Sequence, residues 1–480
     1  MNGRTSATTA GKGNAPGRTG SSPRGGASGW SGNVAQPDVL KPPSGKLPQL
    51  LRGMKDILPV DQPYWNAVLN AVDAEARAFS FEYIEVPVLE ATSLFKRSVG
   101  EATDIVEKEM YTFADKGGDS ISLRPEFTAS VARAYIEHGM LNQPQPVKLY
   151  TVGPLFRYER PQAGRFRQHT QFNFEVIGEA HSIVDAQLML LLDHFYRGFE
   201  LTPSFQINSI GDANCRPAYV KLLKAYAQKH KEKLCEDCRE RLQQNPLRLL
   251  DCKQPGCHEV LRGAPQTVDH LCEACKDHFV RVLEYLDEVD VSYVLNPRLV
   301  RGLDYYTRTT FEVWASEDET GAQAALGGGG RYDGLIEQLC GRPTPAVGFG
   351  VGIERVVHLL KERGFTPPLP APPMFFVAQL GEPARKRALK LFNDLRAEGY
   401  RVAEAFSKEG IKHQLEVANR LKVQFALIIG HKEMIDETIL IRDMESGIQE
   451  VLDFAKVMPE LRKRLEKLQA NGETSPVPAA

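Results

Sequence analysis

Residues Leu149–Gly178 read LYTVGPLFRYERPQAGRFRQHTQFNFEVIG and carry the strongest local pattern in the chain. Two runs suited to β-strands, Leu149–Tyr158 and Gln168–Ile177, flank a turn at Pro161-Gln162-Ala163-Gly164, which predicts an antiparallel hairpin with a basic tip. Four arginines within eleven residues, at positions 157, 160, 165 and 167, are interleaved there with Phe and Tyr. Guanidinium groups on rigid strands suit bidentate binding of phosphate and carboxylate. A solvated charged hairpin is the simpler interpretation, but the density of arginine favours a polyphosphate or nucleic-acid site.

Length and composition limit the possible classes of protein. A chain of 480 residues with 42% hydrophobic and 25% charged residues predicts a globular protein of two to four domains. Its net charge of −2 leaves any RNA contact to local patches. No apolar run approaches the roughly 20 residues that cross a bilayer, and no signal peptide is evident. We therefore expect no membrane association, a cytoplasmic setting and reduced cysteines.

The N-terminal residues 1–46 are rich in Gly, Ser, Thr and Pro and contain no acidic residue before Asp38. This composition predicts a disordered tail, with an organelle-targeting segment as the less favoured interpretation. Folded sequence is expected from Leu47, with a helix at Pro63–Phe79. A strand is expected at Phe81–Leu89, which belongs at a sheet edge because of its proline.

Ser122–Ala132, SLRPEFTASVA, predicts a strand end, a turn and the start of a helix. From the residues alone, Arg124, Glu126 and Thr128 are best interpreted as a salt bridge and an N-cap. A further strand is expected at Ile207–Gly211.

Residues from about 216 to 290 predict a helical, charged insertion that contains six of the eight cysteines. Cys235-x-x-Cys238 and Cys272-x-x-Cys275 offer the four thiolates of a zinc site. The gap between the pairs is long, however, and cysteines at this spacing also serve as small apolar residues on helix faces. Zinc is possible but not favoured, and we predict no metal site.

Val291–Val313 reads VSYVLNPRLVRGLDYYTRTTFEV and places two strand-like runs around Arg301-Gly302-Leu303-Asp304-Tyr305-Tyr306. A cation, a carboxylate and two aromatic hydroxyls together suit a small, flat, polar ligand. An ordinary strand pair with a turn is the alternative.

Two glycine-rich stretches follow this run. Leu326–Leu335, LGGGGRYDGL, predicts a glycine run that opens into a helix and lies close to a ligand. Pro345–Leu360, PAVGFGVGIERVVHLL, predicts a strand and then a helix that bears Arg355.

The C-terminal part follows a proline-rich linker within Arg363–Pro373. Strands and helices alternate there, which predicts a small α/β domain with a mostly parallel sheet. The expected strands are Met374–Ala378, Arg401–Ala405, Phe425–Ile429 and Thr438–Asp443, and the expected helices are Pro383–Glu398 and Ile411–Leu421.

These motifs together resemble the class II aminoacyl-tRNA synthetases, and in particular the bacterial histidyl-tRNA synthetase family. FRYERPQAGRFRQ resembles the family's motif 2, RGLDYYTRTTFE its signature peptide and GVGIER its motif 3, in the family's order. Pro63–Leu89 resembles motif 1, and NPLRLLDCK resembles part of the insertion that lies over the tRNA acceptor stem. One departure is Phe127, where the family has glycine in RPEGT. We expect this ring to point away from the ligand pocket.

The resemblance implies a mixed α/β (α+β) fold: an antiparallel-sheet catalytic core at residues 47–365, with its insertion at about 216–290, and an α/β anticodon-binding domain at 374–469. A linker at 366–373 and tails at 1–46 and 470–480 complete the expected division. The implied activity is a ligase that activates L-histidine with ATP and Mg²⁺ to histidyl-adenylate. It then transfers the histidyl group to tRNA(His), working as a homodimer.

The resemblance also implies roles for particular residues. Arg301 and Arg157 would be catalytic, with Arg157 on the α-phosphate. ATP would further contact Glu159, Arg165 and Arg355, and histidine would contact Glu126, Thr128, Gln171, Glu175, Tyr305 and Tyr306.

Two alternatives remain open at this point. The first is the non-catalytic regulatory subunit of the histidine-biosynthetic phosphoribosyltransferase, which keeps the catalytic fold but lacks an anticodon-binding domain and generally loses RGLDYY. The second is a synthetase for another amino acid, such as proline or threonine, which would not be expected to carry RGLDYY.

Overall fold

The computed structural model describes residues 47–101, 103–160, 164–315, 325–340 and 342–470. The predicted tails at 1–46 and 471–480 and the predicted turn residues 161–163 lie outside these ranges. Among the described residues, no helix combines the length and the apolar character needed to cross a membrane.

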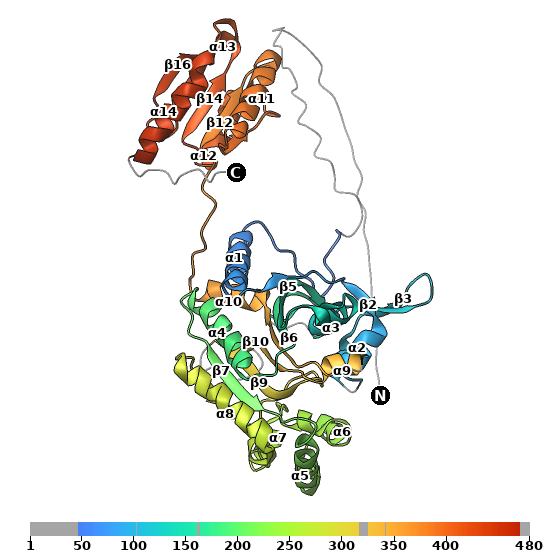
Figure 1. Cartoon of the computed structure of the whole chain (residues 1–480). Coiled ribbons are helices and arrows are strands. Elements are labelled where there is room, and N and C mark those ends of the chain that lie inside the picture. Colours follow the sequence, from blue (N-terminus) through green and yellow to red (C-terminus); the bar gives the residue numbers. More distant parts are fainter. Residues whose placement is uncertain (1–46, 102, 161–163, 316–324, 341, 471–480) are drawn as a thin grey trace, which may run out of the picture. The chain divides into compact units, whose positions relative to one another are not determined.

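An eight-stranded mixed sheet forms the centre of the N-terminal part, in the order β1-β5-β6-β11-β10-β9-β7-β8 (Figure 1). The six inner strands, from β5 through β6, β11, β10 and β9 to β7, each pair antiparallel with the next. The edge strands β1 and β8 run parallel to their neighbours β5 and β7. This arrangement confirms the predicted antiparallel core. The strands are β1 (Glu82–Tyr83), β5 (Val147–Phe156), β6 (Gln168–Ile177), β7 (Ser204–Ser209), β8 (Tyr293–Leu295), β9 (Thr307–Trp314), β10 (Ala325–Arg331) and β11 (Ala346–Gly352).

Strands β5 and β6 form the predicted hairpin, in a register that runs from Val147 opposite Ile177 to Phe156 opposite Gln168. Side chains alternate between the two faces of the sheet because successive residues of a strand point in opposite directions. Phe172 and Phe174 therefore enter the core on one face, whereas Gln171 and Asn173 point to the other.

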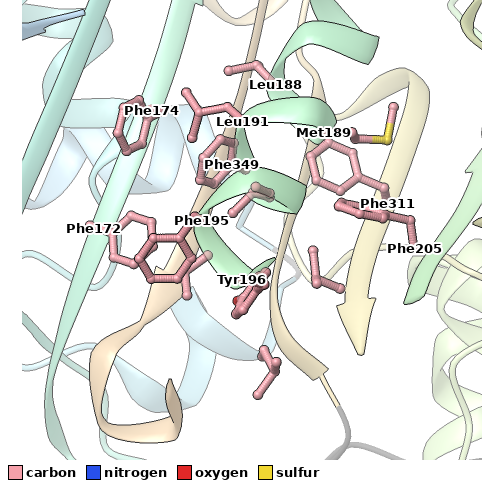
Figure 2. Packing of buried hydrophobic residues seen from close by; sticks show 14 of the residues in the cluster. Phe172, Phe174, Leu188, Met189, Leu191, Phe195, Tyr196, Phe205, Phe311 and Phe349 are labelled. Atoms are coloured by element: carbon pink, nitrogen blue, oxygen red, sulfur yellow. The ribbon is translucent and has the colours of Figure 1, made fainter. Parts of the chain in front are cut away.

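The aromatic face of the sheet is covered by α1 (Gln62–Ala78), α4 (Ile183–Arg197) and α10 (Ile353–Glu362), together with α8 (Glu273–Glu288) of the insertion. Figure 2 shows the side chains packed under α4, where Phe172, Phe174 and Phe349 of the sheet meet Leu191 and Phe195 of the helix. The rings of Phe174 and Phe349 stack with their centroids 5.3 Å apart. This large apolar layer holds β6 and β11 rigidly, so polar groups on their opposite face have fixed positions.

The opposite face is covered by α2 (Thr92–Val99), α3 (Thr128–Glu137) and α9 (Leu335–Cys340), which contact one another. A three-stranded sheet of order β2-β4-β3 accompanies them, with β2 (Leu89–Ala91), β3 (Thr112–Ala114) and β4 (Ser120–Leu123). Short π and 3₁₀ turns complete this description of the chain: η1 (Ile105–Glu109), η2 (Met140–Asn142), η3 (Lys231–Lys233), η4 (Pro246–Leu249), η5 (Thr267–His270) and η6 (Phe454–Lys456).

Two expected elements differ from the prediction. The single strand expected at Phe81–Leu89 is divided into β1 and β2, which lie in different sheets, because Pro87 has no N–H to donate to a ladder. The glycine run at 327–330 lies inside strand β10 between β9 and β11, and the helix that was expected to follow it, α9, begins at Leu335. Glycine is needed at these strand positions, because a Cβ there would collide with neighbouring backbone and side-chain atoms.

The insertion leaves the sheet after β7 and returns at β8. It contains α5 (Arg216–Lys229), α6 (Glu236–Gln244), α7 (Pro255–Leu261) and α8 (Glu273–Glu288). Helix α8 packs on α4 and β9, and the other helices enclose a small core of their own that contains buried cysteines. The predicted helical character of this segment is correct.

The C-terminal part is a five-stranded sheet of order β13-β12-β14-β15-β16. It is parallel only between β12 and its neighbours β13 and β14, whereas β15 pairs antiparallel with β14 and β16, so "mostly parallel" was wrong. Strand β16 and helices α13 and α14 were not anticipated. The elements are β12 (Phe375–Gln379), α11 (Glu382–Ala397), β13 (Val402–Glu404), α12 (Ile411–Arg420), β14 (Phe425–Ile429), α13 (His431–Ile435), β15 (Thr438–Asp443), β16 (Gln449–Asp453) and α14 (Val457–Ala470).

Candidate active site

A cavity of about 1000 Å³ opens on the polar face of β6, β10 and β11. The start of α3, the start of α10, the Arg301–Tyr306 segment and part of the insertion complete its walls. Ten of the eleven residues predicted for the site line it: Glu126, Thr128, Arg157, Glu159, Arg165, Gln171, Arg301, Tyr305, Tyr306 and Arg355. Glu175 does not line the cavity.

One part of the cavity is rich in guanidinium groups. The Arg157 Nε donates to the carbonyl oxygen of Pro125 at 2.8 Å, and the Arg165 Nη1 donates to the Glu159 carboxylate at 3.2 Å. The Arg355 Nε donates to the carbonyl of Gly164 at 3.4 Å. Burial and the neighbouring Arg165 lower the pKa of Arg355. Three guanidinium groups gathered on one part of the cavity wall make this region suited to a polyanion.

His169 was missed by the sequence reasoning and lies in the same cavity. Burial, together with the positive charges of Arg157 and Arg355, lowers its pKa to about 3. The imidazole is therefore neutral at physiological pH and adds a polar, uncharged group to the wall. Its signal in the sequence was its spacing of two from Gln171, since alternate residues of a strand share one face.

The start of α3 supplies the carboxylate of Glu126. Its two oxygens accept hydrogen bonds from the backbone N–H groups of Thr128 at 2.7 Å and Ala129 at 2.8 Å. The expected cap is therefore present, but Glu126 provides it. The expected salt bridge is replaced, because the Arg124 Nε donates to the carbonyl of Pro154 at 2.9 Å. Burial raises the pKa of Glu126.

Glu175 lies directly behind the cavity wall. Its carboxylate accepts hydrogen bonds from Thr128 Oγ1 at 2.8 Å and from the hydroxyl of Tyr332. Glu175 of β6 pairs with Gly348 of β11, and the Glu175 side chain fills the space that a Cβ at Gly348 would need. Burial raises the pKa of Glu175 to about 8.

Replacing Glu175 by glutamine should change how stability depends on pH. The folded-state pKa of Glu175 lies above its ordinary value of 4.5, so the folded protein binds more protons than the unfolded chain between pH 4.5 and about 8. As the pH rises through this window, the free energy of unfolding of the wild type should therefore fall relative to that of Glu175→Gln. The fall should be at most about 1.4 kcal/mol per pH unit. Urea unfolding at several pH values measures it. Parallel pH profiles for the two proteins would contradict the prediction.

Arg301 is half-buried on the wall of the cavity. Its Nη1 donates to the Glu312 carboxylate at 2.7 Å, and its guanidinium carbon lies 5.8 Å from the ring centroid of Tyr306. The Nε is buried without a hydrogen-bond partner in the described part of the chain. Gly328 leaves room for it, because a Cβ at that position would lie 2.7 Å from Arg301 Nη1. Because Arg301 also lines the cavity, this unpaired donor leaves a place for an acceptor atom of a ligand.

The insertion forms part of the cavity wall and holds the Arg301–Tyr306 segment. The amide of Asn245 donates to the Asp304 carboxylate at 2.7 Å, and the Arg248 Nη1 donates to the carbonyl of Arg301 at 3.4 Å. Arg248 and Arg241 also pair with Asp104, at 3.3 and 3.4 Å. Sequence reasoning did not find these contacts, because they join positions more than fifty residues apart.

Phe127 is fully buried and does not line the cavity, as expected. Its φ of −96° needs no glycine, and the guanidinium of Arg124 lies over its ring, 4.4 Å from the centroid. The aromatic ring therefore supports the wall from behind while Glu126 and Thr128 face the cavity.

Known proteins with a similar sequence or structure match most of this chain. Residues 53–356 match the family model described as Histidyl-tRNA synthetase, and residues 375–464 match the one described as Anticodon binding domain. A Histidine--tRNA ligase of Dehalococcoides mccartyi (strain ATCC BAA-2266 / KCTC 15142 / 195) is 48% identical over 415 residues, which cover 86% of this chain and 99% of the relative.

Two solved structures give the same result for the fold. Apo histidyl-tRNA synthetase of S. aureus is 36% identical, with a TM-score of 0.71, and the match covers 86% of this chain and 99% of that one. A Bacillus halodurans protein described as an ATP phosphoribosyltransferase regulatory subunit/histidyl-tRNA synthetase matches with a TM-score of 0.56. Its identity is 21%, over 80% of this chain and 98% of that one, so this likeness shows the fold alone.

Proposed function

Because this chain belongs to the histidyl-tRNA synthetase family and is a histidine–tRNA ligase, we propose that its large cavity is where ATP and L-histidine react. The observation that carries the proposal is the meeting of two chemistries in one cavity. A guanidinium-rich region suits a triphosphate, and Arg301 adjoins it with an unpaired buried donor. The tyrosines and polar groups elsewhere in the cavity suit a small aromatic amino acid.

In the guanidinium region, Arg157 binds the α-phosphate and Glu159 contacts the adenine side. Arg165 and Arg355 bind the γ-phosphate. Arg157 is held by the carbonyl of Pro125, which fixes the direction of its fork before ATP arrives. The ion pair between Arg165 and Glu159 keeps the guanidinium at the cavity without neutralising the region.

Mg²⁺ would enter with ATP. This ion binds through one or two carboxylates and the phosphates of the substrate while keeping several waters. Glu109 and Glu159 line the cavity near these arginines and are carboxylates of the required kind. The ion would supply charge neutralisation on the phosphates.

The histidine pocket combines hydroxyl, amide and carboxylate groups with two aromatic walls. A neutral or charged imidazole offers two nitrogen positions, and the amino group offers donors, so these partners match histidine better than an apolar amino acid. Glu175 positions Thr128, because its carboxylate accepts a hydrogen bond from the Thr128 hydroxyl at 2.8 Å. The proposed histidine-binding residues are Glu126, Thr128, Gln171, Glu175, Tyr305 and Tyr306.

The reaction has two steps. An oxygen of the histidine carboxylate attacks the α-phosphorus, the bond to the bridging oxygen breaks, and diphosphate leaves with those electrons. A ribose hydroxyl at the end of tRNA(His) then attacks the carbonyl carbon, and AMP leaves. No protein nucleophile is needed, and the protein contributes positioning and charge stabilisation. Arg301 provides a permanent cation between two anions that must meet.

The alternative of a non-catalytic regulatory subunit has weaker support. The chain carries the RGLDYY peptide and a match to an anticodon-binding family model, which this alternative is expected to lack. Its support is a fold likeness at 21% identity.

The decisive measurement is ATP–pyrophosphate exchange with each amino acid in turn. We expect exchange with histidine and none above background with proline or threonine. Histidine binding without any exchange would support the regulatory alternative instead.

We further propose that the protein works in the cytoplasm as a homodimer and that its chain divides as predicted from the sequence. The absence of a membrane-spanning helix among the described residues is consistent with this location. The matches at residues 53–356 and 375–464 support a boundary between the catalytic and anticodon-binding parts within the residues that separate them.

A further inference from the structure

Seven cysteines of the insertion and its root gather into two groups of four possible ligands. The first group (site 1) is Cys235, Cys238, Cys252 and Cys257, and the second (site 2) is Asp212, Cys215, Cys272 and Cys275. Within each group all the ligand atoms lie within 4.8 Å of one another. The two Cys-x-x-Cys pairs therefore do not share one site, as the sequence had suggested, and each pair is completed by other residues.

Site 1 has the dimensions of a tetrahedral thiolate centre. The sulfurs of Cys235 and Cys252 are 3.8 Å apart. Four sulfurs at about 2.3 Å from a central Zn²⁺ are separated by about 3.8 Å, whereas a disulfide needs about 2.0 Å. The backbone N–H of Cys235 donates to Cys257 Sγ at 3.2 Å, which holds the segment before α6 against the Cys257 side chain of α7.

The two sites are built in the same way. Cys235 immediately precedes α6 and Cys238 lies in its first turn, and Cys272 and Cys275 have the same positions on α8. Helix N-termini stabilise negative charge, and thiolates are the ligand form of cysteine. Two separate segments that repeat this placement, each facing two further ligands, are not required by apolar packing.

Site 2 lies where the insertion joins the catalytic core. Asp212 and Cys215 follow β7, at the start of the insertion, and α8 carries the chain back towards β8. The backbone N–H of Asp212 donates to Cys215 Sγ at 3.4 Å, and Arg308 approaches the Asp212 carboxylate at 3.7 Å. The Asp212 carboxylate also accepts a hydrogen bond from the backbone N–H of Asn214 at 2.9 Å, and a carboxylate beside three cysteine sulfurs is an ordinary zinc ligand.

We propose that the insertion holds two Zn²⁺ ions, one in each site. Thiolate-rich tetrahedral sites select zinc over the harder divalent cations. Site 1 lies within the small core of α6 and α7, whose packing residues include Cys238, Cys252 and Cys257, so the metal replaces apolar area that this core is too small to provide. Site 2 fastens the two ends of the insertion together. This inference reverses the preference for a metal-free insertion drawn from the sequence.

The test is metal analysis of the full-length protein, purified without chelators or a metal-affinity tag. We expect about two Zn²⁺ per chain, falling to about one in Cys257→Ser and to about one in Cys275→Ser. Cys340→Ser is the matched control, because it removes a cysteine that is not among the eight proposed ligands, and its zinc content should not change. Adding Co²⁺ to the reduced, metal-free protein should produce the visible absorption of tetrahedral thiolate coordination, with two equivalents bound.

Hydrogen exchange provides a structural readout independent of catalysis. Cys257→Ser should accelerate exchange of the backbone amides of α6 and α7, because metal binding and folding of such a small core are coupled. Exchange in α11 of the C-terminal part should be unaltered.

Several results would overturn the proposal. Wild-type protein without stoichiometric metal, and without a Co²⁺ spectrum, would overturn both sites. A single zinc that is lost in Cys257→Ser but kept in Cys275→Ser would overturn site 2 and support site 1. Iron in place of zinc would overturn the identity of the ion, and disulfides detected by intact mass would overturn the thiolate ligands.

Discussion

Replacing Arg301 by alanine should lower the rate of histidine-dependent ATP–pyrophosphate exchange by about 10²–10³-fold, which corresponds to roughly 3–4 kcal/mol of transition-state stabilisation. The half-buried guanidinium lies beside Glu312, and its buried Nε has no hydrogen-bond partner in the described part of the chain. It is thus ready to accept an anionic ligand without displacing a protein hydrogen bond. Its contribution grows as negative charge is brought to the α-phosphate, so kcat should fall more than the affinity for either substrate.

Two controls separate this role from a general loss of structure. Arg301→Lys should recover little exchange, because an ammonium keeps the charge but lacks the planar fork. Transfer from preformed histidyl-adenylate should suffer much less, and affinity for tRNA(His) should hardly change. Near-normal exchange in Arg301→Ala would remove Arg301 from the mechanism.

Replacing Phe127 by glycine should cost stability while leaving the histidine KM almost unchanged. The ring is fully buried in the core beneath the cavity, and truncating a buried phenylalanine typically costs about 3–5 kcal/mol. Loss of the ring also removes the surface on which the Arg124 guanidinium rests. The measurements are urea unfolding and histidine-dependent exchange on the same protein.

Phe127→Leu is the matched control, because leucine fills most of the same space and should lose much less stability. A large gain in histidine affinity in Phe127→Gly, without loss of stability, would show that the ring narrows the pocket and would contradict its position in the structure.

The hairpin and the cavity residues were predictable because their signals are local. Alternation along Gln168–Ile177 fixes which side chains share a face, and the four arginines of the tip identify the anionic chemistry. The signature RGLDYY then restricted the amino acid. Ten of the eleven predicted residues meet in one cavity, although their individual roles await the experiments above.

What could not be predicted depends on contacts distant in the sequence. Glu175 lies behind the cavity wall, where Thr128 and Tyr332, from other parts of the chain, donate hydrogen bonds to its carboxylate. The strand nature of the glycine run depends on strands β9 and β11 on its two sides. The grouping of the cysteines required knowing that Cys252 and Cys257 return to Cys235, a pairing that spacing alone left open.

The glycines of β10 and β11 make the floor of the cavity from main chain rather than side chains. Any side chain at Gly328 would meet Arg301 and the carbonyl of Phe311, and any side chain at Gly350 would meet Gln171. Single substitutions therefore cannot remodel this floor without displacing a functional group, which makes it resistant to evolutionary tuning. Changes in substrate preference must therefore arise from the side chains of the walls, such as those that the start of α3 and the Arg301–Tyr306 segment supply.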